Sequence, residues 1–277
     1  MVDLVRNFIT DLNTFTIYGP NHTEMVSKYT FSHRLPFEHD LDPVWWTVAV
    51  FQPYWYHSIT ISVIYFILIK LIQKWMEPRK AFSLKTPLVL WNAGLAIFSI
   101  IAMIRSTEDA VRSLLYSGVY RTVCYSCNPN GVFAFWSLSF AISKLVELGD
   151  TLFIILRKRK LIFLHYYHHA AVLIYTAHSG AEHTAAGRVF VWMNLVAHSF
   201  MYSYYTVTAL GYRPAKWVSM FVTTVQTSQM LAGVAVSCQQ SMANLYLSFL
   251  IYLTFAFLFI KFFVEAYILG GKKKKLQ

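Results

Sequence analysis

Seven apolar segments, each about as long as a membrane-crossing helix, dominate this sequence. A helix rises about 1.5 Å per residue, so about 20 apolar residues span the hydrocarbon core of a bilayer. The segments lie at roughly 54–74, 86–106, 132–156, 161–180, 189–210, 217–237 and 244–269. Backbone polar groups find no partners in lipid, so such segments must satisfy them internally as helices. The sequence therefore predicts an all-α, polytopic membrane protein with seven transmembrane helices.

The composition agrees with a membrane protein and argues against a nucleic-acid-binding one. Of the 277 residues, 56% are hydrophobic and only 13% are charged, whereas soluble domains carry about 25% charged residues. The net charge of +11 comes from short basic blocks between apolar segments, which is typical of cytosolic loops. We predict a luminal arm at 1–53, a helical domain at 54–270 and a basic tail at 271–277. No basic stretch leads into an early apolar run, so no cleaved signal peptide is expected.

The basic blocks also predict the orientation of the chain. Lysines and arginines are concentrated in alternate connections, at residues 70–85, 157–160, 213–216 and 272–275. The positive-inside rule places these on the cytosolic side, so the N-terminus is luminal and the C-terminus cytosolic. Asn21 begins an Asn-His-Thr sequon on the luminal side and is a candidate glycosylation site. Lys274 and Lys275 resemble a dilysine retrieval signal, which predicts the endoplasmic reticulum membrane; a basic cluster against anionic lipid is the alternative.

All three cysteines fall on the predicted luminal side: Cys124 and Cys127 in the long connection after the second segment, and Cys238 after the sixth. An oxidising lumen permits one disulfide among three possible pairs. We expect the Cys124–Cys238 pair, because it ties a long loop to the helices. Three free, buried thiols are the alternative, and no cysteine lies near a candidate catalytic group.

Four consecutive apolar segments each carry a polar stripe at helical spacing. The stripes are Lys144, Glu147, Asp150 and Thr151; His165, His168 and His169; Asn194, His198, Tyr202 and Tyr205; and Thr223, Gln226 and Gln229. Lipid cannot satisfy these groups, so they must meet one another or line a cavity. A single stripe would fit hydrogen bonds between neighbouring helices. Four stripes favour an internal polar chamber.

The depth of these stripes indicates what the chamber accommodates. At about 1.5 Å per residue, His165 to His169 lie roughly 8–14 Å past Lys160, and His198 lies near the midplane. The chamber is therefore expected to open toward the cytosol and to end in mid-bilayer. Beyond it the segments are apolar and aromatic, as at Trp136 and Tyr175. This combination suits an amphipathic substrate, with a charged carrier at the mouth and an acyl chain in the membrane.

The stripes, taken together, resemble the motifs of the fatty acid elongase (ELO/ELOVL) family. The matching patterns are Lys144-x-x-Glu147-x-x-Asp150-Thr151, His165-x-x-His168-His169, Asn194-x-x-x-His198-x-x-Met201-Tyr202-x-Tyr204-Tyr205 and Thr223-x-x-Gln226-x-x-Gln229. The resemblance covers about residue 50 to the C-terminus. It implies a 3-ketoacyl-CoA synthase that condenses long-chain acyl-CoA with malonyl-CoA, without a further cofactor or a metal. It also implies that six of the seven helices enclose a narrow tunnel. The Leu161–His169 context is similar to the branch acting on saturated and monounsaturated chains.

The resemblance implies roles for the polar residues. His168 would be a nucleophile that carries the acyl group as an acyl-imidazole. His198 would activate or stabilise it, and His165 and His169 would orient the ring or donate to the thioester oxygen. Glu147 and Asp150 either fix imidazole tautomers or pair with Lys144. The candidate substrate-binding residues, which include donors to developing oxyanions, are Lys144, Glu147, Asp150, Asn194, Tyr202, Tyr205, Gln226 and Gln229.

Two other functions compete with this interpretation. A membrane di-iron desaturase or hydroxylase also uses histidine boxes, but it needs more histidines than the four placed here. A seven-helix receptor or transporter fits a glycosylated luminal arm but not a cytosol-opening chamber with four histidines. Besides acyl-CoA, malonyl-CoA and the bilayer, a homodimer and the reductases and dehydratase of an elongation cycle stay open as partners. Trp192, above His198, is a candidate cap for the acyl chain or else an interfacial anchor.

Overall fold

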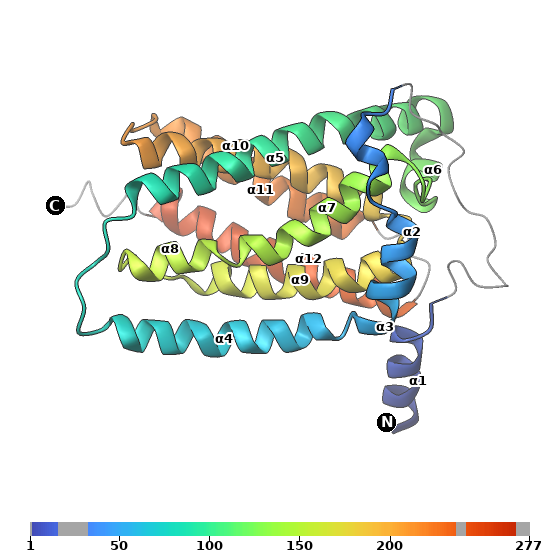
Figure 1. Ribbon diagram of the computed structural model, residues 1–277, viewed down its shortest axis with the longest axis horizontal. Coiled ribbons are helices and arrows are strands. Elements are labelled where there is room, and N and C mark those ends of the chain that lie inside the picture. Colours follow the sequence, from blue (N-terminus) through green and yellow to red (C-terminus); the bar gives the residue numbers. More distant parts are fainter. Residues whose placement is uncertain (1, 16–32, 237–241, 270–277) are drawn as a thin grey trace.

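The computed structural model describes residues 2–15, 33–236 and 242–269, and every regular element in these ranges is helical. The predicted all-α class is confirmed. Figure 1 shows a bundle in which the long helices run side by side along the longest axis. These long helices are α4 (His57–Met76), α5 (Lys85–Arg112), α7 (Val132–Glu147), α9 (Phe163–Glu182), α10 (Gly187–Leu210), α11 (Lys216–Ala235) and α12 (Met242–Phe263). The short helix α8 (Asp150–Leu156) follows α7.

Each of the seven predicted apolar segments is therefore mainly helical, although the second helix runs beyond its predicted end and the third segment is divided into two helices. By length and composition, the described chain contains three helices that are apolar enough to cross a membrane: His57–Met76, Lys85–Cys124 and Asn244–Leu269. The other four segments carry the polar stripes, whose side chains lower the apolar character of the helix. The first of these segments is also divided into α7 and α8, each of which is shorter than a membrane span. A helix with polar side chains on one face can lie in a membrane only if that face is turned toward protein or a cavity.

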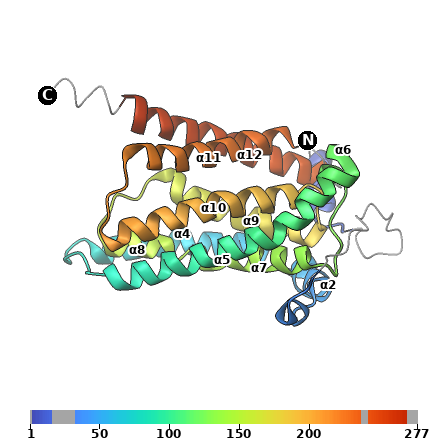
Figure 2. The ribbon, with the colours of Figure 1, turned by 90° about the horizontal axis from the view of Figure 1, so that it is seen from above.

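The long helices pack in a closed circuit. Helix α5 contacts α7 and α10, α9 contacts α7 and α12, and α11 contacts α10 and α12. Helix α4 lies outside this circuit, against α8 and α9. Figures 1 and 2 agree in placing α4 and α11 on different sides of the bundle. The circuit brings the four polar stripes, on α7 to α11, toward a common interior.

The third apolar segment is not one continuous helix over 132–156, as the sequence predicted. It breaks between α7 and α8, at Leu148 and Gly149. The break occurs where Trp91 of α5 approaches the backbone so closely that a Cβ on Gly149 would lie 2.7 Å from its ring. The Trp91 indole Nε1 donates to Asp150 Oδ1 at 2.6 Å. The break therefore turns Asp150 toward α5.

The second segment also extends further than predicted. Helix α5 continues to Arg112, then through η3 (Ser113–Ser117) into α6 (Gly118–Cys124). The long loop expected after residue 106 is therefore largely helical up to Cys124. Asp109 does not end the helix, because its carboxylate is buried 2.6 Å from Arg188 Nε of α10. A paired charge can stay inside the bundle where an isolated one would not.

The basic connections predicted to share one side do lie at one end of the bundle. The links 77–84, 157–162 and 211–215 gather at the end drawn on the left in Figure 1. The N-terminal elements lie at the opposite end. They are α1 (Val2–Leu12), η1 (Pro36–His39), α2 (Pro43–Trp46), η2 (Thr47–Phe51) and α3 (Gln52–Tyr54).

A buried carboxylate fastens the N-terminal arm to this second end. Glu38 of η1 accepts hydrogen bonds from Arg105 Nε and from Trp136 Nε1, both at 2.8 Å. Burial alone would raise the pKa of Glu38, but these bonds and the one from the Leu35 backbone outweigh it and hold the pKa below its usual value. The arm is thus attached to α5 and α7 through one ionised group.

Candidate active site

The polar stripes meet around a cavity of about 130 Å³, here called the chamber. Its walls come from α8, α9, α10, α11 and α12. The predicted site residues that line it are Asp150, His165, His168, His169, Asn194, His198, Tyr202, Tyr205, Gln226 and Gln229. Lys144 and Glu147 do not line it and lie behind its wall. The structure thus brings together residues that are up to 79 positions apart in the sequence.

Lys144 and Glu147 form a buried pair that supports this wall. The Lys144 ammonium donates to Glu147 Oε1 at 2.7 Å and to Asn194 Oδ1 at 3.1 Å, and it lies 4.1 Å from the centre of the Phe140 ring. Glu147 Oε1 is also 3.6 Å from His198 Nδ1. Glu147 therefore pairs with Lys144, which is one of its two predicted roles, and also lies near a chamber imidazole. Buried charges persist when they are paired in this way.

Asp150 has different partners, although it shares a stripe with Lys144 in the sequence. Its carboxylate accepts from Trp91 Nε1 and, at 2.8 Å, from the Tyr202 hydroxyl. His169 Nε2 lies 3.9 Å from the same carboxylate. Asp150 thus orients Tyr202 and faces His169. Sequence reasoning missed Trp91, because a tryptophan near a segment end has the same signature as an interfacial anchor.

His165 is held through a chain of hydroxyl groups that reaches outside the helix circuit. Its Nε2 is hydrogen-bonded to Thr151 Oγ1 at 3.0 Å, and Thr151 Oγ1 lies 2.5 Å from the hydroxyl of Tyr65 on α4. Tyr65 is buried. It was also missed, since none of the predicted site residues lies on α4.

Gln226 and Thr223 of α11 each contact a side chain of another element. The Gln226 amide donates toward Met201 Sδ at 3.1 Å. Thr223 Oγ1 shares a hydrogen bond with the Tyr267 hydroxyl at 3.1 Å. Gln226 therefore keeps its amide at the chamber wall without a strong polar bond. Such an amide is available to a substrate oxygen.

Of the four chamber histidines, His168 is the one whose buried ring nitrogen has no hydrogen-bond partner within the described residues, a property that it shares with His178 outside the chamber. Among the described residues, Nδ1 of His168 is buried and accepts or donates no hydrogen bond. Its ring packs against Phe255, with centroids 4.8 Å apart, and against Phe259. A buried polar atom without a partner is costly and calls for an explanation. The location of His168 explains the unpartnered nitrogen, because this residue lines a second cavity as well as the chamber.

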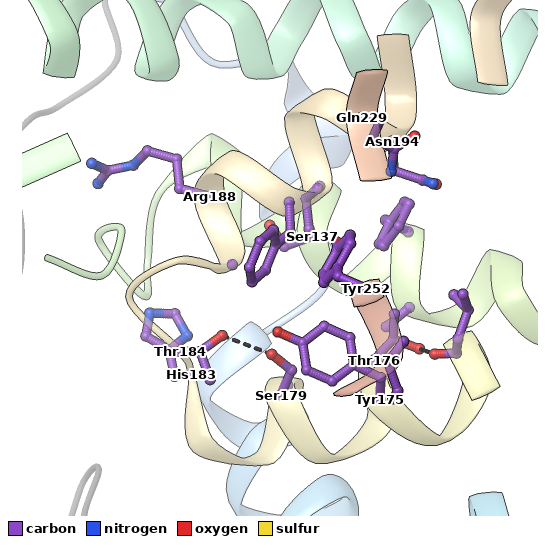
Figure 3. A pocket seen from close by; sticks show the side chains of 18 of the residues that line it. Ser137, Tyr175, Thr176, Ser179, His183, Thr184, Arg188, Asn194, Gln229 and Tyr252 are labelled. Carbon is purple, nitrogen blue, oxygen red and sulfur yellow. Dashed lines mark hydrogen bonds between the residues drawn. The ribbon is translucent and has the colours of Figure 1, made fainter. Parts of the chain in front are cut away.

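The second cavity, here called the apolar cavity, has a volume of about 110 Å³. It shares His168, Asn194, Gln229 and Met230 with the chamber, and most of its other walls are aromatic or aliphatic. Figure 3 shows Asn194 and Gln229 at one end of it, and Thr184 and His183 at the other. The polar chamber and the apolar cavity therefore adjoin at His168.

A third cavity, of about 400 Å³, adjoins the chamber on its other side and is here called the mouth. It shares Asp150, His165 and Tyr205 with the chamber. Arg157 and Arg159 also line it, so it lies at the end of the bundle where the basic connections gather. Mouth, chamber and apolar cavity thus follow one another along the bundle, from basic to polar to apolar.

Two residues of α10, Arg188 and Trp192, are bonded to α5 at the far end of the bundle. Arg188 is 2% exposed and paired with Asp109. It also donates to the carbonyls of Thr122 and Ser126. Trp192 was a candidate cap for an acyl chain, but it does not line the apolar cavity. Its Nε1 donates to Thr107 Oγ1 at 2.9 Å, which turns the ring toward α5.

The cysteines and the terminal signals are described only in part. Cys124 is in a disulfide, so three free thiols are ruled out. Cys127 is a free, buried thiol, so it is not the partner of Cys124. Cys238 lies outside the described residues, and the Cys124–Cys238 pair stays a prediction. Asn21, Lys274 and Lys275 also lie outside the described residues. Within residues 2–15, 33–236 and 242–269, no three His, Cys, Asp or Glu side chains are grouped as metal ligands would be.

Comparisons with known proteins agree with the motifs. Residues 50–275 match the ELO family, described as the GNS1/SUR4 family. The chain is 66% identical to "Putative fatty acid elongase 4" of Caenorhabditis elegans, over 98% of this chain and 97% of that protein. It is 42% identical to human "Very long chain fatty acid elongase 3", over 82% of this chain and 88% of that protein. It is also 42% identical to human "Very long chain fatty acid elongase 6", over 81% and 88% respectively. The chain therefore belongs to the ELO (GNS1/SUR4) family of fatty acid elongases.

Proposed function

We propose that this protein condenses a long-chain acyl-CoA with malonyl-CoA, giving 3-ketoacyl-CoA, carbon dioxide and CoA. Membership of the ELO family and relatives named fatty acid elongases support this activity. One observation carries the mechanism: His168, with an unpartnered ring nitrogen, lies where the polar chamber meets the apolar cavity. A thioester that enters with its acyl chain in the apolar cavity would place its carbonyl at this junction.

The first half-reaction transfers the acyl group to the protein. A ring nitrogen of His168 attacks the thioester carbonyl, a C–N bond forms and the C–S bond breaks. The proton that the acylated ring loses goes to the departing CoA thiolate. An acyl-imidazole is more reactive than a thioester, so one difficult step becomes two easier ones. His198, whose Nδ1 lies 3.6 Å from Glu147 Oε1, lines the same chamber and can stabilise the charge that develops.

The second half-reaction forms the carbon–carbon bond. Malonyl-CoA loses carbon dioxide, and the electron pair of the broken bond passes to its C2 carbon. This carbon attacks the acyl carbonyl, the C–N bond to His168 breaks, and a proton from solvent restores the neutral ring. The enolate oxygen requires donors. The side-chain amides of Asn194 and Gln226, on the neighbouring helices α10 and α11, line the chamber and have the right chemistry for this role.

The charge distribution supports the direction in which substrate enters. Arg157 and Arg159 at the mouth can bind the phosphates of CoA, for which guanidinium groups are well suited. We propose that all seven apolar segments cross the membrane, with the basic end cytosolic and the N-terminus luminal. The common position of the basic connections supports this topology. The endoplasmic reticulum location and the preference for saturated or monounsaturated chains stay predictions.

The test uses purified protein in vesicles with labelled malonyl-CoA and a series of acyl-CoAs. His168→Ala should abolish condensation, whereas His57→Ala, at an exposed histidine on α4, should preserve it. Acyl-CoA alone should release one CoA per active protein and leave an acyl adduct on His168. Kinetics that require a ternary complex, with no adduct by mass spectrometry, would contradict the covalent scheme. Bound iron with oxidation of the acyl chain would favour a desaturase, and absence of malonyl-CoA turnover would favour a receptor or transporter.

A further inference from the structure

Helix α1 is an amphipathic helix that precedes the family match and contributes no residue to the three cavities. Its apolar residues Val5, Phe8, Ile9 and Leu12 follow the spacing i, i+3, i+4, i+7, which places them on one face. The other face carries Asp3, Arg6, Asn7, Thr10 and Asp11. The helix is therefore built to lie between an apolar and a polar environment.

The described protein does not cover the apolar face of α1. Val5 is 50% exposed, Phe8 39% and Ile9 53%. Leu12, at the end that joins the bundle, is only partly exposed. Three neighbouring apolar side chains on a single short helix form a continuous surface, and surfaces of this kind mark a site of contact with protein or lipid.

Specific contacts fix α1 at one end of the bundle. The His178 ring donates from Nε2 to the carbonyl of Leu12 at 2.9 Å, and Trp55 Nε1 donates to Asn13 Oδ1 at 3.1 Å. The Trp55 ring packs edge-on against His178, with centroids 4.7 Å apart. Helix α1 also contacts α12. The helix is therefore held in a defined direction rather than left to move on a linker.

That direction is across the bundle. Figure 1 shows α1 running at a steep angle to the long axis along which the long helices lie. It is attached beside the start of α4, where exposed apolar residues such as Ile59 and Val63 begin. If the long helices cross the bilayer, α1 lies in the plane of the membrane, at the level where the lipid-facing surface of α4 begins. This level is the boundary between headgroups and acyl chains.

We propose that α1 is an interfacial membrane helix that inserts Val5, Phe8 and Ile9 into the luminal leaflet, beside the start of α4. This inference rests on the membrane orientation of the proposed function but not on the catalytic mechanism. The polar face offers two acids and one base, Asp3, Asp11 and Arg6. It has no cationic excess for anionic lipid, so burial of apolar surface drives the insertion. Zwitterionic lipid is sufficient, and added salt has little effect.

The test uses the full-length protein in phosphatidylcholine vesicles. Single cysteines for an environment-sensitive dye replace Val5 or Phe8 on the apolar face, and Asn7 or Thr10 on the polar face as matched controls. Cys127, the free thiol among the described residues, is buried and gives little background. Dyes at Val5→Cys and Phe8→Cys should be quenched by lipids with a nitroxide near the headgroup and protected from iodide. Dyes at the two control positions should be quenched by iodide and not by the nitroxide lipids.

Three results would overturn the proposal. Equal iodide quenching on both faces would place α1 in water. A disulfide-linked dimer through Phe8→Cys would make a second copy of the chain the occupant, and insertion that requires anionic lipid would contradict the charge argument. Ile9→Asp should abolish lipid quenching of the dye at Phe8→Cys. Condensation is measured in the same vesicles: if activity persists without insertion, only this inference fails, and if insertion occurs without condensation, only the proposed function fails.

Discussion

Thr176 is the position at which the length of the acyl chain can be altered most directly. It lies on α9, beyond His168, and lines the apolar cavity (Figure 3). Its hydroxyl donates to the carbonyl of Val172 in its own helix, at 2.8 Å. Replacing Thr176 therefore removes no hydrogen bond to another helix. We predict that Thr176→Phe fills the cavity at this level and shortens the longest acyl chain that the protein accepts.

The size of the effect follows from the geometry of α9. At about 1.5 Å per residue, Thr176 lies about 12 Å from His168, and Gly180, near the far end of the cavity, about 18 Å. Carbon–carbon bonds of about 1.5 Å at about 111° advance about 1.25 Å per carbon, so these distances take about 10 and about 14 carbons. Phenylalanine would thus exclude about four carbons. At about 0.8 kcal/mol per buried methylene, the loss is about 3 kcal/mol, or about a hundredfold in kcat/KM.

The assay measures kcat/KM with saturated acyl-CoAs of increasing length and labelled malonyl-CoA. Chains that end before Thr176 should react normally with Thr176→Phe, whereas longer chains should lose about a hundredfold. Thr176→Val, which has nearly the same volume, should keep the original profile. An unchanged profile in Thr176→Phe would show that the acyl chain does not occupy this cavity. An equal loss at every length would indicate damage to the fold and would also refute the reasoning.

Three further predictions concern positioning and stability. Tyr65→Phe removes the hydroxyl that lies 2.5 Å from Thr151; it should lower kcat about tenfold with KM for acyl-CoA unchanged, and an unchanged kcat would contradict this positioning role. The depressed pKa of Glu38 contributes stability that is present above its usual value of 4.5 and is lost as pH falls below it. Thermal unfolding should therefore show an acid-dependent loss that Glu38→Gln lacks, with the variant about 2–3 kcal/mol less stable at neutral pH; parallel acid profiles would argue against it. Peptide mapping without reductant should recover Cys124 linked to Cys238, and Cys124 in any other linkage would refute that pair.

The sequence alone determined which segments become helical and which of them carry polar stripes. Both properties are local, because the length and the helical periodicity of an apolar segment can be read from that segment alone. Lipid imposes the same requirement on every segment, so each apolar run becomes helix. The same requirement forced the stripes of α7 to α11 inward, and the chamber histidines could be named from spacing alone. His165, His168, His169 and His198 do line one cavity.

Only the tertiary structure decided which side chains meet. Glu147 and Asp150 share a stripe, yet the break at Gly149 directs one toward Lys144 and His198 and the other toward α5 and Tyr202. Tyr65 and Trp91 reach the site from helices α4 and α5, which contribute none of the predicted site residues. Arg188 is buried because α5 extends far enough to supply Asp109. These outcomes depend on contacts between segments far apart in the chain, and the spacing within one helix carries no information about its neighbours.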